Sequence, residues 1–192
     1  MNRPNPDTLR DLGENVTNVA NAWAGATDYL SRGLKAWTRD AISGDRTNAV
    51  QAALAACTLV AATYPSQPGE GLPPRTYIDN MLAAIRTWIA DPSKENTEAV
   101  RSSLDVTREA HAWQRETDVA PFWILEAVDH ASLAVWAGER SSYIVPMDFA
   151  TCAARAVACV LHAMLDSGET EPNAIAAIVK AVEAVTGTTH VR

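Results

Sequence analysis

Chemistry in a helical protein needs polar side chains that share one face of an apolar segment, and Glu126, Asp129 and His130 have that arrangement. Spacings of three and four residues bring side chains to the same side of a helix. A carboxylate and an imidazole one turn apart can exchange a proton or ligate a metal ion. The alternative interpretation is structural: Glu126 and His130 form an intrahelical pair at a partly buried seam.

A metal centre would need further ligands, since two side chains do not complete a coordination shell. His111 and His162 are the candidates from other predicted helices. A carboxylate-bridged di-iron bundle is excluded, because such bundles carry Glu-x-x-His on two helices. This chain has that motif on none.

The cysteines offer a second possible chemistry. Cys152 and Cys159 lie two helical turns apart, about 10 Å, which is too far for a disulfide. His162 follows Cys159 at a spacing that suits a thiolate–imidazole pair, but no motif for an oxyanion hole or an orienting group accompanies it. With Cys57 the cysteines are odd in number and lack a C-x-x-C motif. We expect reduced, buried thiols.

Length and charge exclude several classes of protein. The 192 residues, 47% of them hydrophobic, suffice for one domain with its own core. The net charge of -7 argues against nucleic acid, whose binders carry a basic face. The longest apolar run is shorter than a bilayer span, and the first residues lack the layout of a secretory signal. We expect a cytoplasmic protein with neither nucleic acid nor membrane as a partner.

The positioning elements are predicted to be helices, because apolar residues recur at intervals of three and four between Pro, Gly and Asp. The predicted helices cover about residues 7–43, 45–63, 75–90, 92 or 96 to 116, 121–138, 146–165 and 171–187. Gly25 or Gly33 can split the first of them. Gly44 predicts a helix stop and Asp45 the next N-cap. Asp91 is the predicted N-cap of the fourth helix, and Asp148 favours the start of the sixth. Residues 65–74, rich in Pro and Gly, predict a surface connection.

These helices predict an all-α fold of about three consecutive helix pairs plus a C-terminal helix. Residues 1–187 are expected to form one domain, and residues 188–192 a loose tail. Trp37, Trp88 and Trp136 each fall near the end of the first helix of a pair, which indicates a repeat of roughly fifty residues. Because a pair cannot bury its apolar stripe alone, the stacked hairpins form either an α-solenoid-like array or a compact bundle.

Four short segments between about residues 70 and 137 combine Ala, His and aromatic residues. They are 74–78 (PRTYI), 84–88 (AIRTW), 109–113 (EAHAW) and 129–131 (DHA). They resemble the helices of immunity proteins that bacteria encode beside polymorphic toxins. The resemblance implies binding of a toxin without turnover of a substrate, and His111 and His130 match recurrent histidines of that family. A later histidine of the family is replaced here by Leu133-Ala134-Val135.

The leading hypothesis is a non-catalytic protein-binding module, an immunity protein that neutralises a toxin domain. Its acidity would steer a basic partner. The candidate partner-binding residues are Glu126, Asp129, His130 and His111, and we expect no catalytic residue, metal or cofactor. One alternative is a structural subunit of a helical assembly, for which a homo-oligomer is open. Another is a metal-dependent enzyme that uses Glu126 and His130.

Overall fold

The computed structural model describes residues 32–42, 44–68, 72–111, 119–137 and 148–187. Over these residues the chain forms helices and no strand, which confirms the predicted all-α class. In chain order, the helices are α3 (Arg32–Ala41), α4 (Arg46–Ala61), α5 (Arg75–Ala90), α6 (Lys94–His111), α7 (Val119–Trp136), α8 (Phe149–Asp166) and α9 (Glu171–Thr186).

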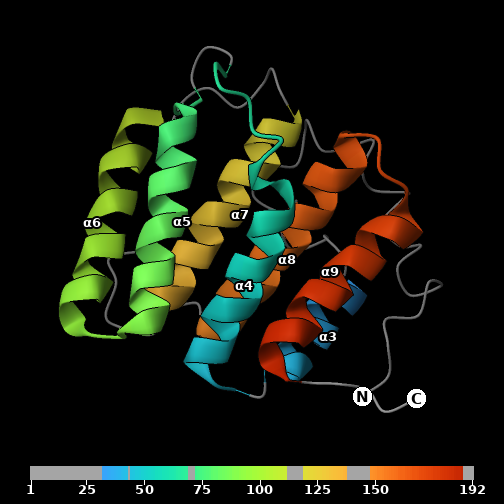
Figure 1. Cartoon of the computed structure of the whole chain (residues 1–192), viewed down its shortest axis with the longest axis horizontal. Helices are drawn as coiled ribbons and strands as arrows, with labels where there is room; N and C mark the ends of the chain where they lie inside the picture. The colour runs from blue at the N-terminus through green and yellow to red at the C-terminus, as the bar shows by residue number, and fades with distance from the viewer. Residues whose placement is uncertain (1–31, 43, 69–71, 112–118, 138–147, 188–192) are drawn as a thin grey trace.

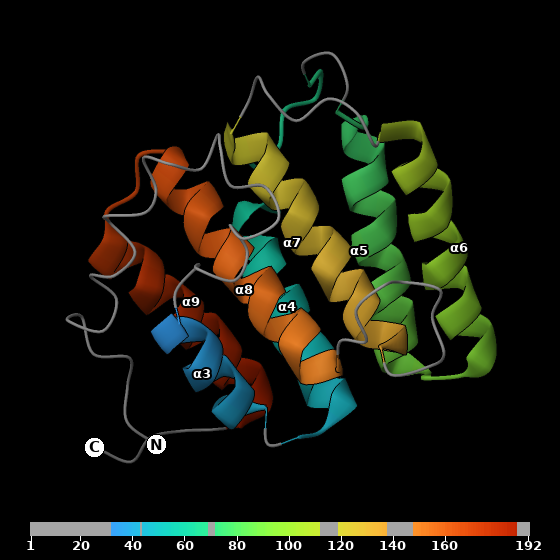
Figure 2. The ribbon, with the colours of Figure 1, turned by 180° about the vertical axis from the view of Figure 1, so that it is seen from behind.

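The helices pack in two layers. In Figure 1, α5, α4 and α9 lie side by side at the front, and α6 packs on the outer side of α5. Seen from behind, α7, α8 and α3 form the other layer (Figure 2). Helix α4 packs against α7, α8 and α9, all distant in sequence, whereas a solenoid repeat contacts only its neighbours. Of the two forms expected, the fold is therefore the compact bundle.

Small side chains permit the close packing at the centre of the bundle. Helix α4 buries Ala49, Ala52, Ala53 and Ala56 where it crosses α7 and α8. Helix α8 buries an almost unbroken run from Cys152 to Ala163. By length and composition α8 could span a membrane, with a mean hydropathy of 1.4, but 61% of it is buried inside the bundle. A helix that is apolar all round is also the ordinary form of a central core helix.

Local signals determine most helix ends, as the sequence predicts. Asp45 is the N-cap of α4, and its carboxylate accepts a hydrogen bond from the Asn48 amide at 2.8 Å. Gly44, which precedes it, has a φ of +73°, a conformation that glycine adopts without strain. Asp148 caps α8 in the same way, accepting from the Thr151 amide at 2.6 Å.

The predicted N-cap of the fourth helix is wrong. Asp91 is the C-cap of α5, and α6 begins three residues later. Because α6 begins at Lys94, Pro92 and Ser93 separate Asp91 from the first helical turn. Ser93 takes the capping position, where its Oγ accepts from the Asn96 amide at 3.3 Å. The Asp91 carboxylate instead accepts from the Asn96 side chain at 3.1 Å.

The repeated tryptophans occupy the predicted positions. Trp37, Trp88 and Trp136 lie in the last turns of α3, α5 and α7, and all three are buried. Trp88 Nε1 donates to Thr97 Oγ1 at 2.9 Å, which joins α5 to α6. Helices α5–α6 and α7–α8 pack as hairpins, whereas α3 packs chiefly against α8. Only two of the three expected pairs are therefore hairpins in space.

Some predictions fall outside the described residues. They are the part of the first predicted helix before residue 32, the end of the fourth after residue 111, the start of the sixth before residue 148, and the tail 188–192. Within the connection at 65–74, residues 69–71 are also outside. The described part is tied to the bundle, because Tyr64 Oη donates to the carbonyl of the buried Pro73 at 2.8 Å.

Candidate functional site

The polar residues Glu126, Asp129 and His130 all lie on α7, which packs between α5 and α8. From residue 127 to residue 137 every side chain of this helix is buried. Asp129 and His130 are therefore polar groups within the core, and Glu126 lies at its edge. Buried polar groups persist when they are hydrogen-bonded or paired, so their partners decide what the site can do.

Glu126 and His130 form the intrahelical pair that their spacing predicts. His130 Nε2 lies 3.8 Å from Glu126 Oε2, with 8% of the His130 side chain and 22% of the Glu126 side chain exposed. This separation permits electrostatic attraction but exceeds hydrogen-bond length. The seam interpretation of the pair therefore agrees with the geometry.

Asp129 is engaged by a residue that sequence reasoning did not connect to it. Tyr77 on α5 donates a hydrogen bond from its hydroxyl to Asp129 Oδ1 at 2.9 Å. The spacing of apolar residues identifies Tyr77 only as part of the inward stripe of its own helix. Because 52 residues separate the partners, no local signal could have paired them.

The buried thiols of Cys57 and Cys159 are protonated near neutral pH. Burial raises the pKa of Cys57 to about 12. Burial, and next the negative charge of Glu126, hold the pKa of Cys159 well above its usual value. The thiolate is the nucleophilic form of cysteine, so neither residue has the microenvironment of a reactive thiol.

His162 does not complete a thiolate–imidazole pair with Cys159. Its ring lies against Trp123, with centroids 4.8 Å apart and planes inclined by 35°. His162 is 1% exposed and its Nε2 has no hydrogen-bond partner among the described residues. Burial lowers the pKa of His162 to about 4, so the imidazole is neutral at pH 7. The surroundings are those of a core aromatic ring.

The remaining candidate, His111, is the last residue of α6, and its side chain is not described. Whether it approaches His130 is therefore outside the described part of the structure. Among the described side chains, no group of three or more His, Cys, Asp or Glu is placed to hold a metal ion. The structure brings Glu126 and His130 together and adds Tyr77 to Asp129.

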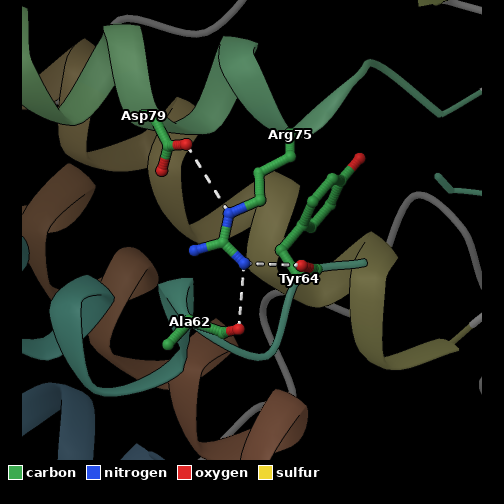
Figure 3. A network of polar contacts seen from close by, with 4 residues as sticks. All are labelled: Ala62, Tyr64, Arg75 and Asp79. Carbon is green, nitrogen blue, oxygen red and sulfur yellow. Dashed lines mark hydrogen bonds and ion pairs between the residues drawn. The ribbon is translucent and has the colours of Figure 1, made fainter. Parts of the chain in front are cut away.

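Arginine side chains hold helix ends together inside the bundle. Figure 3 shows Arg75, the first residue of α5, whose Nη1 donates to the carbonyls of Ala62 and Tyr64, each at 3.0 Å. Its Nε lies 3.5 Å from Asp79. The last carbonyls of a helix lack partners within the helix, and Arg75 supplies them to the end of α4.

Arg46 does the same for α7, across about ninety residues of sequence. It donates to the carbonyls of Val135 at 3.2 Å and Ala137 at 2.8 Å, and its guanidinium lies 5.6 Å from the centre of the Phe149 ring. The guanidinium of Arg101 lies 5.2 Å from the centre of the Trp136 ring. In these contacts the guanidinium groups of Arg46 and Arg101 are partly buried. No motif in the sequence predicts them.

The fully exposed charged residues of the described structure are mostly acidic. Nine described acidic residues are exposed against four basic ones. The acidic residues are Asp40, Asp45, Asp79, Asp91, Glu95, Glu98, Asp148, Asp166 and Glu169; the basic residues are Arg39, Arg86, Lys94 and Lys180. The whole chain has 23 acidic and 16 basic residues, so the fully exposed charges share the acidic character of the chain.

Comparison with known proteins identifies no relative. No family model matches the chain, and no match is found among curated proteins or solved structures.

Proposed function

We propose that the protein is a non-catalytic, cytoplasmic protein-binding module whose acidic surface binds a basic partner protein. The observation that supports this proposal is the excess of exposed carboxylates over exposed cations. Complementary charge raises the rate of encounter and orients the two surfaces.

The polar groups of α7 support binding over catalysis. Asp129 accepts a hydrogen bond from Tyr77, and Glu126 and His130 lie 3.8 Å apart. A general base must reach a substrate proton, and the burial of Asp129 and His130 opposes that approach. Of the candidate residues whose side chains are described, Glu126 is the most exposed and is the one to contact a partner directly. Asp129 and His130 would act by orienting α7.

The resemblance of residues 70–137 to immunity proteins suggests the kind of partner, a toxin domain. A toxin that acts on nucleic acid carries a basic surface, because its substrate is a polyanion. An acidic inhibitor would then cover the surface that the toxin needs. His111 and His130, the positions that match the family's histidines, belong to α6 and α7, which contact each other.

The test is co-expression with a toxin domain encoded beside this protein's gene. We expect growth to be rescued, and the purified proteins to form a one-to-one complex. Its affinity should fall at least about tenfold between about 50 and 300 mM salt, because the attraction is electrostatic. Absence of both rescue and salt-sensitive binding would contradict the proposal.

Matched charge variants sharpen this test. Replacing Asp91, Glu95 and Glu98 with their amides removes three exposed carboxylates and should weaken the complex. Replacing Arg86, Lys94 and Lys180 with glutamine removes three exposed cations and should leave it unchanged or strengthen it. Equal weakening by both triple variants would indicate that charge does not select the partner.

A further inference from the structure

The turn between α5 and α6 contains an aspartyl–prolyl bond, Asp91–Pro92, at one end of the bundle (Figure 1). Asp91 is the C-cap of α5 and has an extended backbone, with φ of -144° and ψ of 92°. Both residues are exposed, so water and protons reach the bond between them. An aspartate side chain can attack its own main-chain carbonyl carbon, because the ring that forms has only five members.

The carbonyl oxygen of Asp91 accepts two hydrogen bonds. The Ser93 amide donates to it at 2.8 Å, and Asn96 Nδ2 donates to it at 2.8 Å. This oxygen is the atom that gains negative charge when the Asp91 carbonyl carbon is attacked. Two N–H donors directed at such an oxygen form an oxyanion hole, which stabilises the tetrahedral intermediate.

The side chain of Asn96 also holds the nucleophile. Its Nδ2 donates to Asp91 Oδ2 at 3.1 Å as well as to the Asp91 carbonyl oxygen. An amide –NH2 group carries two hydrogens, so it can serve both oxygens. The carboxylate is therefore kept beside the carbonyl group that it would attack, which reduces the entropy lost in that step.

Contacts between α5 and α6 fix Asn96 beside this bond. Trp88 Nε1 donates to Thr97 Oγ1 at 2.9 Å, and this contact is buried. Thr97 Oγ1 donates to the Ser93 carbonyl at 2.9 Å, and Ser93 Oγ accepts from the Asn96 amide at 3.3 Å. The end of α5 and the start of α6 are thus joined around Asp91–Pro92, and the oxyanion hole exists before any reaction.

We propose that the protein cleaves its own chain at the Asp91–Pro92 bond. A carboxylate oxygen of Asp91 attacks the carbonyl carbon of the same residue, and the oxyanion forms between the Ser93 amide and Asn96 Nδ2. When this intermediate collapses, the bond to the Pro92 nitrogen breaks and the nitrogen takes a proton from solvent. Water then hydrolyses the cyclic anhydride left on Asp91 to two carboxyl groups, one of which is the new C-terminus.

Cleavage divides the chain into residues 1–91 and 92–192, and the bundle holds the two parts together. Helix α4 of the first part packs against α7, α8 and α9 of the second. The break is therefore visible only after denaturation. Each chain reacts once and turns over no substrate, so this reaction is independent of the proposed binding of a partner.

The test is mass spectrometry of the full chain, denatured after incubation at about pH 6 or about pH 7. We expect fragments that end at Asp91 and begin at Pro92, formed faster at the lower pH because the leaving nitrogen needs a proton. Glu171–Pro172 is the control within the chain and should stay intact, since glutamate must close a larger ring.

The chain unfolded in guanidinium chloride is the control for ordinary acid lability of aspartyl–prolyl bonds. The folded chain should cleave at least about tenfold faster than the unfolded chain, because only the fold supplies the oxyanion hole. This comparison uses the wild type alone and does not depend on the folding of any variant.

Variants separate the two roles. Asp91→Ala removes the nucleophile and should abolish cleavage in both states. Asn96→Ala should slow the folded chain at least about tenfold and leave the unfolded rate unchanged. Asn173→Ala is the matched control, because Asn173 donates in the same way to the Glu169 carboxylate, at 3.0 Å, near the start of α9. It should cleave at the wild-type rate.

A wild-type chain that stays intact at both pH values would overturn the proposal. A folded chain that breaks no faster than the unfolded chain would also overturn it, since the bond would then have only the lability of its sequence. Equal rates for folded Asn96→Ala and folded wild type would exclude the oxyanion hole and with it the proposal.

Discussion

The two buried histidines of α7 and α8 have opposite surroundings. His130 lies within the core beside Glu126, and it follows Asp129, which accepts a hydrogen bond from Tyr77. His162 lies against Trp123, with Nε2 unpartnered among the described residues. We call Glu126, His130, Tyr77 and Asp129 the His130 cluster, and His162 and Trp123 the His162 cluster. The comparison teaches that one bundle buries imidazole in two settings, beside a carboxylate and against an aromatic ring.

The largest expected effect is in the His162 cluster. Trp123→Ala removes a side chain that is 2% exposed and contacts both His162 and Phe122. The cavity should cost about 3–5 kcal/mol of unfolding free energy, measured by urea denaturation. Phe122→Ala is the control, since Phe122 is only partly buried, and it should cost less. Equal costs would show that Trp123 is not central to this packing.

The second largest effect is a loss of stability at low pH that comes from the His162 cluster. The pKa of His162 is lowered from 6.5 to about 4, so between these pH values the unfolded chain binds more protons than the folded one. Stability is therefore complete above about pH 6.5 and falls as the pH decreases toward 4, by up to about 3 kcal/mol. His162→Phe should abolish this component. Urea unfolding of the wild type and of His162→Phe from pH 7 to pH 4 isolates the contribution of His162, because the other groups titrate in both proteins. If stability fell with pH in parallel in the two proteins, His162 would not be its cause.

A smaller loss is expected when the His130 cluster loses its phenol. Tyr77→Phe removes the hydroxyl that donates to the buried Asp129, and should cost about 2 kcal/mol. Asp129→Leu removes the acceptor for that hydroxyl, and a double-mutant cycle between the two changes measures their coupling. Additive effects in denaturation experiments would mean that the hydrogen bond contributes nothing specific.

The smallest effect is expected for Glu126→Gln. The 3.8 Å separation from His130 exceeds a hydrogen bond and Glu126 is partly exposed, so the cost should be below about 1 kcal/mol. It should shrink further as salt is added, which unfolding at two ionic strengths would reveal. If Glu126→Gln lowered the free energy of unfolding as much as Tyr77→Phe, the Glu126–His130 pair would contribute as much as the Tyr77–Asp129 hydrogen bond, contrary to this prediction.

Much of the fold could be predicted from local pattern. Helix α5 has the predicted bounds, Arg75 to Ala90, because its apolar stripe runs between two prolines that mark its ends. The N-cap of α4 at Asp45 was likewise predictable, since capping involves residues only three apart. The prediction failed at Asp91 because two capping residue types lie within three positions, and Ser93, which the sequence analysis did not consider, is the one whose Oγ accepts from the Asn96 amide.

The candidate site was predictable only in part. The spacing of Glu126 and His130 predicts that the two side chains pair, because both belong to one helix. No local pattern predicts the hydrogen bond from Tyr77 to Asp129 or the contacts of Arg46 with α7, because each joins segments far apart in the sequence. The predicted role of Glu126, Asp129, His130 and His111 in binding a partner stays a prediction.

By itself, the sequence determined most of the described helices, the N-cap of α4 and the inward Trp37, Trp88 and Trp136, because periodicity and capping act within a few residues. Only the tertiary structure decided that α4 packs against α7 and α8 and that arginines join distant helix ends. Packing chooses among many pairings of similar apolar stripes, and the choice depends on all of them together.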